Sequence, residues 1–150
     1  MVRSIEGKHF GYFEAILQLR NVSSMILDFV YAEIDRGKIH IAKEVESKNG
    51  LDIYLADDDF TKALGRKLQE QFGGETKITA TLYSQKDGKD IYRITVLFRA
   101  VPFKKGDLVK YKGAEYEVKI LGKDIMLQAL KTGKKAHVKY KEMQLIKIKD

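Results

Sequence analysis

The first hundred residues alternate between two hydrophobic periods, and this alternation limits the folds that the chain can adopt. Apolar residues recur at every second position in residues 12–20 and then at helical spacing in residues 23–37. Alternation returns on both sides of a turn at 48–50, a second helical pattern covers residues 57–72, and two more alternating segments flank a turn at 87–88. The predicted order is β-α-β-β-α-β-β, which favours a mainly antiparallel sheet with two helices packed on one face.

Side chains with oxygen acceptors mark the predicted start of each helix. Ser23 precedes the first helical pattern, and the run Asp57-Asp58-Asp59 precedes the second. An oxygen at this position accepts a hydrogen bond from a free backbone N–H of the first turn, and carboxylates there face the positive end of the helix dipole. Three adjacent carboxylates are also potential ligands of a divalent cation. Capping explains them without a metal, so we predict no metal site.

The pattern of apolar residues and turns changes after Pro102. Five short apolar segments separated by glycine turns follow, and strands this short bury their apolar positions by curling into a small barrel. We therefore predict an α+β fold with two domains: the β-α-β-β-α-β-β domain at residues 1–103 and a small SH3-like five-stranded β-barrel at residues 104–150. The predicted barrel strands are residues 108–111, 116–120, 125–130, 136–140 and 144–148.

The net charge of +7 lies in the last third of the chain. Residues 104–150 carry 13 lysines, no arginine and six carboxylates, whereas residues 1–103 carry equal numbers of basic and acidic side chains. A concentrated positive field attracts polyanions and accelerates their encounter, so the predicted ligand is RNA. The alternative is a solvated lysine-rich surface that binds nothing.

The predicted RNA-binding residues are mainly basic side chains of the barrel and its turns. They are Lys104, Lys105, Lys110, Lys112, Lys131, Lys134, Lys135, His137, Lys139, Tyr140 and Lys141. Lysines contact phosphates as mobile point charges, which predicts recognition of an RNA shape more than of a base sequence.

A possible second RNA surface is the outward face of the predicted sheet. Its alternation places Lys77, Arg93 and Arg99 on that face. Because the pattern shows no set of aromatic residues there to stack on bases, an ordinary solvated sheet face is the preferred interpretation.

Several classes of chemistry find no support in the sequence. The absence of cysteine excludes disulfides, thiolate nucleophiles and cysteine-ligated zinc, and His9, His40 and His137 lack the short spacings of metal ligands. No nucleophile motif or phosphate-binding glycine loop is found, so we predict no catalytic residue, no cofactor, no small-molecule substrate and no enzyme activity. No apolar run approaches the roughly 18 residues of a membrane span, so we predict a soluble, cytoplasmic protein without membrane contact.

Three segments of the sequence resemble a known family. They are residues 12–20 (Tyr-Phe-Glu-Ala-Ile-Leu-Gln-Leu-Arg), residues 50–56, and residues 92–99 with the following Pro-Phe and Gly-Asp-Leu-Val pieces. They are similar, in order, to the archaeal branch of the large-ribosomal-subunit nuclear-export adaptor family, which is historically named after nonsense-mediated decay. The family's zinc-binding region, with paired Cys-X-X-Cys motifs, is missing from this sequence, so the subunit contacts of that region are not assumed.

The resemblance implies a non-enzymatic protein that binds the large ribosomal subunit during maturation or quality control. Its partners would be ribosomal RNA and ribosomal proteins, with the SH3-like domain docked on RNA or near the stalk of the tRNA exit region. An alternative is a protein–protein interaction module without direct RNA contact, in which the neutral domain docks a protein and the basic domain only adds solubility.

Overall fold

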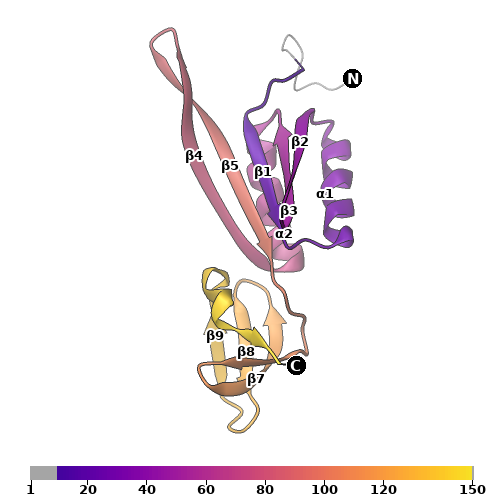
Figure 1. Ribbon diagram of the computed structural model, residues 1–150, viewed down its shortest axis with the longest axis vertical. Helices are drawn as coiled ribbons and strands as arrows, with labels where there is room; N and C mark the ends of the chain where they lie inside the picture. Colours follow the sequence, from indigo (N-terminus) through magenta and orange to yellow (C-terminus); the bar gives the residue numbers. More distant parts are fainter. Residues whose placement is uncertain (1–9, 150) are drawn as a thin grey trace.

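The computed structural model describes residues 10–149, which form two five-stranded sheets stacked end to end (Figure 1). We call the first sheet with its two helices the N-terminal unit. Its elements are β1 (Ala15–Arg20), α1 (Ser24–Gly37), β2 (Ile41–Ser47), β3 (Gly50–Leu55), α2 (Asp58–Phe72), β4 (Gly74–Lys86) and β5 (Lys89–Ala100). Within residues 10–149 no helix combines the length and the apolar character needed to cross a membrane.

The N-terminal sheet has the strand order β2-β3-β1-β5-β4. Neighbouring strands are antiparallel except β1 and β5, which run parallel and are connected through α1, β2, β3, α2 and β4. The element order and the mixed α+β class are as the hydrophobic periods predict.

One face of this sheet and both helices share a single hydrophobic core. Every second residue of β1 is buried, including Leu17 and Leu19, and these side chains pack with residues of both helices, such as Val30 and Leu64. The opposite face of the sheet carries the alternate residues and has no helix over it (Figure 1). This open face is available for contacts with other molecules.

The predicted helix caps are confirmed. Ser23 Oγ accepts a hydrogen bond from the backbone N–H of Ile26 at 3.3 Å, and Asp57 Oδ1 accepts one from the N–H of Phe60 at 2.9 Å. Each cap satisfies a donor that has no partner within its own helix.

The second sheet, which with its helical turn we call the C-terminal unit, has the order β10-β6-β7-β8-β9. Its elements are β6 (Leu108–Tyr111), β7 (Ala114–Leu121), β8 (Ile125–Ala129), β9 (Lys135–Val138), the 3₁₀ helix η2 (Tyr140–Leu145) and β10 (Lys147–Ile148). It has its own core, to which Phe103 contributes. The division into domains at residues 103 and 104 stays a prediction.

The expected closed five-stranded barrel is not what the C-terminal unit forms. The outer strands β9 and β10 do not pair, and the predicted last strand at 144–148 is reduced to two residues after η2. Tyr140, Met143 and Ile146 are the buried residues of this segment, and their spacing of three matches a 3₁₀ helix, in which side chains at i and i+3 eclipse. A period of three therefore replaces the alternation that a strand requires.

Strands β4 and β5 extend well beyond the rest of their sheet as a long hairpin (Figure 1). The hairpin points away from the C-terminal unit. Its side toward the helices carries Ile78, Leu82 and Tyr92, all of them exposed.

The buried carboxylate of Glu33 links the two helices. It is 5% exposed, accepts a hydrogen bond from Lys67 Nζ at 2.7 Å, and pairs with Arg36. The hydrogen bond from Lys67 is the main reason why the pKa of Glu33 lies below its ordinary value of 4.5, with burial opposing and Arg36 assisting. A carboxyl whose folded-state pKa is depressed stabilises the fold above its ordinary pKa and loses that contribution as the pH falls through the folded value.

We expect Glu33→Gln to lower the free energy of unfolding by about 1 kcal/mol at pH 7, because the charged hydrogen bond is lost but Lys67 is partly screened by solvent. The difference from the parent chain should shrink at pH 3, as measured by urea denaturation at both pH values. The exposed Glu70 gives the control, Glu70→Gln, which should show no such pH-dependent difference. An equal loss for Glu33→Gln at pH 7 and pH 3 would contradict this role.

Candidate nucleic-acid interface

All nine lysines predicted to contact RNA have exposed side chains. They are Lys104, Lys105, Lys110, Lys112, Lys131, Lys134, Lys135, Lys139 and Lys141. Among the ion pairs of residues 10–149, none involves any of these nine. Two carboxylates of the C-terminal unit pair with other lysines, as Lys119–Glu117 and Lys149–Glu115.

One group of these cations follows the edge strand β9. Lys135, His137 and Lys139 alternate with inward residues, so their side chains share the outer face of the strand. Alternate residues of a strand lie about 6.6 Å apart, which gives a regular row along the edge. His137 Nδ1 lies 3.3 Å from Asp124 Oδ1, so this position of the row also carries a carboxylate.

The row leads to a groove between the two units. The groove has a volume of about 520 Å³, and four lysines from both units line it together with Glu75. These lysines are Lys77, Lys123, Lys139 and Lys141. The fold thus adds Lys77 of β4 to the cations of the C-terminal unit, and Lys123, which the sequence did not single out, joins them.

A second group surrounds Glu115 at the far side of the C-terminal sheet. A hydrogen bond from Lys149 Nζ at 2.7 Å is the largest cause of the lowered pKa of Glu115, and Lys110 and Lys131 lower it further by their charge. Three ammonium groups therefore lie around one carboxylate, which leaves a local excess of positive charge.

Tyr140 is not at the surface. It is 5% exposed within the core of the C-terminal unit, and its hydroxyl donates a hydrogen bond to the carbonyl oxygen of Gly122 at 2.6 Å. Burial, with a smaller contribution from the charge of Asp124, raises the pKa of Tyr140 to about 12. Tyr140 is nevertheless among the residues that line the lysine groove.

The three cations of the possible second surface have different surroundings. Lys77 lines the groove, and Arg99 Nε lies 3.9 Å from Glu75 Oε1. Arg93 lies among aromatic rings at the base of the projecting hairpin. All three lie on the open face of the sheet: Lys77 and Arg99 are both beside Glu75, whereas Arg93 lies further along β5, toward the hairpin.

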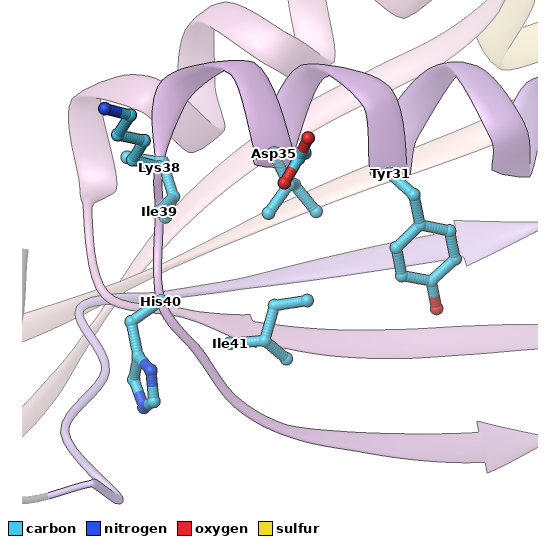
Figure 2. Close-up of a pocket in the computed structure, with 7 residues that line it drawn as sticks. Tyr31, Asp35, Lys38, Ile39, His40 and Ile41 are labelled. Carbon is cyan, nitrogen blue, oxygen red and sulfur yellow. The ribbon is translucent and has the colours of Figure 1, made fainter. Parts of the chain in front are cut away.

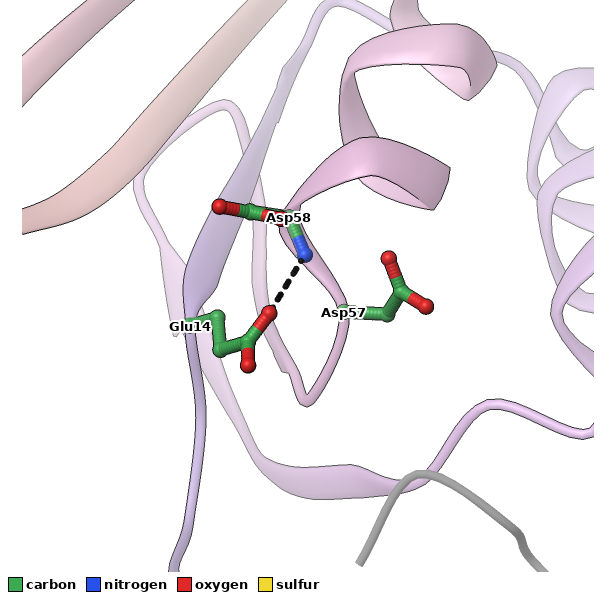
Figure 3. Close-up of side chains that lie close together, drawn as sticks. All are labelled: Glu14, Asp57 and Asp58. Carbon is green, nitrogen blue, oxygen red and sulfur yellow. Dashed lines mark hydrogen bonds between the residues drawn. The ribbon is translucent and has the colours of Figure 1, made fainter.

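Glu14, Asp57 and Asp58 bring carboxylate oxygens within 4.8 Å of one another (Figure 3). The carboxylate oxygens of Asp57 and Glu14 already accept hydrogen bonds from the chain. Asp57 caps α2, and Glu14 accepts from the backbone N–H of Asp58 at 3.0 Å and from the Tyr12 hydroxyl at 2.5 Å. Hydrogen bonding to the first turn of α2 thus accounts for the positions of Asp57 and Glu14.

A pocket lies beside the end of α1 and the start of β2 (Figure 2). It has a volume of about 710 Å³ and contains the ionisable residues Asp35, Lys38 and His40. The imidazole of His40 points away from Asp35 and Lys38, and its Nε2 lies 2.6 Å from the carbonyl oxygen of Phe10 (Figure 2). The pocket does not bring an acid and a base together. His9, the remaining histidine, lies outside the described residues.

Comparison with known proteins agrees with the resemblance of the N-terminal segments. A search of curated proteins gives no match. The family model described as NMD3, second domain, matches residues 12–99, which run from just before β1 almost to the end of β5. Because this match covers more than half of the 150 residues, the chain belongs to the NMD3 family.

Proposed function

We propose that this protein is a non-enzymatic, cytoplasmic factor that binds the large ribosomal subunit during its maturation or quality control. The NMD3 family comprises export adaptors associated with ribosomal subunits, which supplies the general function. The finer proposal is that the C-terminal unit docks on ribosomal RNA or on the stalk of the exit region. The observation that carries it is the set of nine exposed lysines without ion-pair partners among the described residues.

The physical basis of docking is the arrangement of these cations. The lysines of the β9 row and of the groove follow one another along the surface, and a polyanion that contacts them would release counterions from several phosphates. The series contains no arginine, which reads base edges better than lysine does. Binding should therefore depend on backbone shape and on salt, and little on sequence.

Cosedimentation with purified ribosomal subunits tests the proposal. The chain should migrate with large subunits in a sucrose gradient at low salt and not with small subunits at the same concentration. Equal binding to both subunits would show that the basic surface binds polyanions without specificity. Binding to neither would refute the proposal.

The alternative is a protein-interaction module, and the exposed apolar side of the projecting hairpin favours it. Ile78, Leu82 and Tyr92 are exposed there although they are apolar or aromatic. A pull-down from lysate with and without nuclease separates the two functions. Ribosomal partners should disappear after nuclease treatment if RNA mediates the contact, and they should remain if the hairpin binds protein.

The groove itself gives a quantitative prediction. Replacing Lys123 and Lys141 with glutamine should weaken binding to large-subunit RNA several-fold. It should also reduce the slope of log affinity against log salt by roughly 1 to 2, because each lost phosphate contact contributes about 0.7–0.9. Fluorescence anisotropy over a salt series measures both quantities.

A matched control has the same change in net charge in the N-terminal unit. Lys48 and Arg66 are exposed and lie outside the groove, so Lys48→Gln with Arg66→Gln should leave the slope unchanged. If both double variants lower the slope equally, overall charge is responsible and the groove has no special role.

A further inference from the structure

Three aromatic rings from distant parts of the sequence meet on the open face of the N-terminal sheet. The ring of Phe13 packs edge-on against Tyr54, with centroids 4.9 Å apart, and against Tyr83, with centroids 5.7 Å apart. Phe13 precedes β1, Tyr54 lies on β3 and Tyr83 on β4. The fold thus supplies the aromatic residues that were expected to be missing from this face.

Cations lie over the same rings. The guanidinium carbon of Arg93 is 4.2 Å from the centroid of Tyr83 and 5.5 Å from that of Phe13, and Lys43 Nζ is 4.4 Å from the centroid of Tyr54. Nε of Arg93 is buried and has no hydrogen-bond partner within residues 10–149. We call Phe13, Lys43, Tyr54, Tyr83 and Arg93 the aromatic–cation cluster.

Tyr83 lies at a β-bulge of β4. The pairing of β4 with β5 passes from Leu82–Tyr92 to Ser84–Ile91, so Tyr83 is an extra residue without a direct partner. Bulges redirect side chains and are frequent next to functional sites. Although Arg93 lies against its ring, Tyr83 remains 56% exposed.

The charge of the open face is positive around the cluster. Two carboxylates of the face, Asp52 and Glu75, are paired with Arg20 and Arg99. Among the described residues, neither Lys43 nor Arg93 takes part in an ion pair. Glu14, next to Phe13 in the chain, accepts hydrogen bonds from the Tyr12 hydroxyl and the Asp58 backbone N–H.

We propose that the aromatic–cation cluster binds unpaired nucleotides of RNA, with a base stacked on Tyr83 and the flanking phosphates near Lys43 and Arg93. Exposed aromatic rings beside cations on an open sheet are the means by which proteins hold single-stranded RNA. An acidic peptide would use the cations but would leave the rings without a stacking partner. The site lies outside the C-terminal unit and goes beyond the lysine-mediated docking proposed above.

The hairpin provides a matched pair of variants. Tyr92 is on the same hairpin, on its opposite side, and at 52% it is nearly as exposed as Tyr83. Tyr83→Thr removes the proposed stacking ring, Tyr92→Thr removes an equivalent ring elsewhere, and Tyr83→Phe keeps the ring without the hydroxyl. Threonine is well tolerated in strands, so all three full-length variants should retain the fold, which thermal denaturation checks.

Affinity is measured by anisotropy with a short unstructured oligoribonucleotide and with an RNA duplex of the same composition. Tyr83→Thr should weaken binding of the single strand roughly 5- to 150-fold, the range for loss of one base–aromatic stack, and should not change binding of the duplex. Tyr83→Phe and Tyr92→Thr should bind both RNAs like the parent chain. Equal single-strand affinity of Tyr83→Thr and Tyr92→Thr would overturn the proposal and assign the cluster to packing of the hairpin base.

Photo-crosslinking of the same oligoribonucleotide to the unaltered chain gives a second readout that needs no variant. Crosslinked peptides should contain Phe13, Tyr54 or Tyr83. Crosslinks confined to residues 104–149 would refute the single-strand site while leaving docking by the C-terminal unit intact. Failure of cosedimentation with crosslinks still at Tyr83 would refute the ribosomal proposal alone.

Discussion

Reversing the charge of four lysines in the C-terminal unit is expected to abolish binding to large-subunit RNA. The four are Lys131, Lys134, Lys135 and Lys139, all exposed and without ion pairs among the described residues. Glutamate at these positions changes the net charge from +7 to −1 and replaces several phosphate contacts by repulsion. Lowering the salt concentration raises the affinity of a surface with 6–10 phosphate contacts by about 10³–10⁵. We therefore expect the quadruple variant to bind the RNA about 1000-fold or more weakly in a mobility-shift titration.

The location of the charge is tested by two double variants with the same change in net charge. Lys135→Glu with Lys139→Glu alters the β9 row, whereas Lys48→Glu with Arg66→Glu alters the N-terminal unit. The variant of the β9 row should lose much of the RNA affinity that the quadruple variant loses, and the variant of the N-terminal unit should lose little. Identical losses would mean that the net charge alone governs binding. If instead the quadruple variant still captured its ribosomal partners after nuclease treatment, the protein-interaction function would be favoured.

The largest effect on stability is expected at Gly50, the first residue of β3. A Cβ added there would lie 1.8 Å from the carbonyl oxygen of Leu19, which belongs to the neighbouring strand β1. Backbone atoms cannot yield as a flexible side chain can, so Gly50→Ala must separate β1 from β3 at the Arg20–Gly50 pair. We expect a loss of about 3 kcal/mol or more in the free energy of unfolding, measured by urea denaturation with circular dichroism.

Gly122 gives the control for this substitution. An added Cβ there would meet only Ile120 Cγ2, at an ordinary contact distance of 3.7 Å. Gly122→Ala should therefore change stability by no more than about 0.5 kcal/mol. Comparable losses at Gly50 and Gly122 would show that β1 and β3 do not approach as closely as the structure has them.

Local signals in the sequence were enough to predict the elements of the N-terminal unit. Ser23 and Asp57 cap helices as expected, because a cap depends on residues within one turn. The change of period between strands and helices likewise depends on neighbouring residues, so the element order could be derived without tertiary information.

Where the backbone is irregular, alternation in the sequence assigned a side chain to the wrong face of the sheet. Alternation places Val45 on the face of Ile39 and Ile41, but a register shift between Ile41 and Lys43 turns it outward, and Val45 is exposed. A single extra residue inverts every later inside–outside assignment in a strand, and no local pattern marks its position.

The candidate sites were predictable only in part, since they combine residues from separate elements. The positive charge of residues 104–150 is evident from composition alone. The groove also needs Lys77 from β4 beside Lys123 of the C-terminal unit, and the aromatic–cation cluster needs three rings separated by up to 70 positions. Only the packing of strands and units brings such residues together.

The central claim is that the basic C-terminal unit holds the protein on the phosphates of large-subunit RNA. The most direct test is the affinity of the unaltered chain for that RNA, measured by anisotropy from low to physiological salt. We predict a linear fall of log affinity with log salt, with a slope that corresponds to several phosphate contacts at about 0.7–0.9 each. An affinity that stays constant across the salt series would contradict the claim.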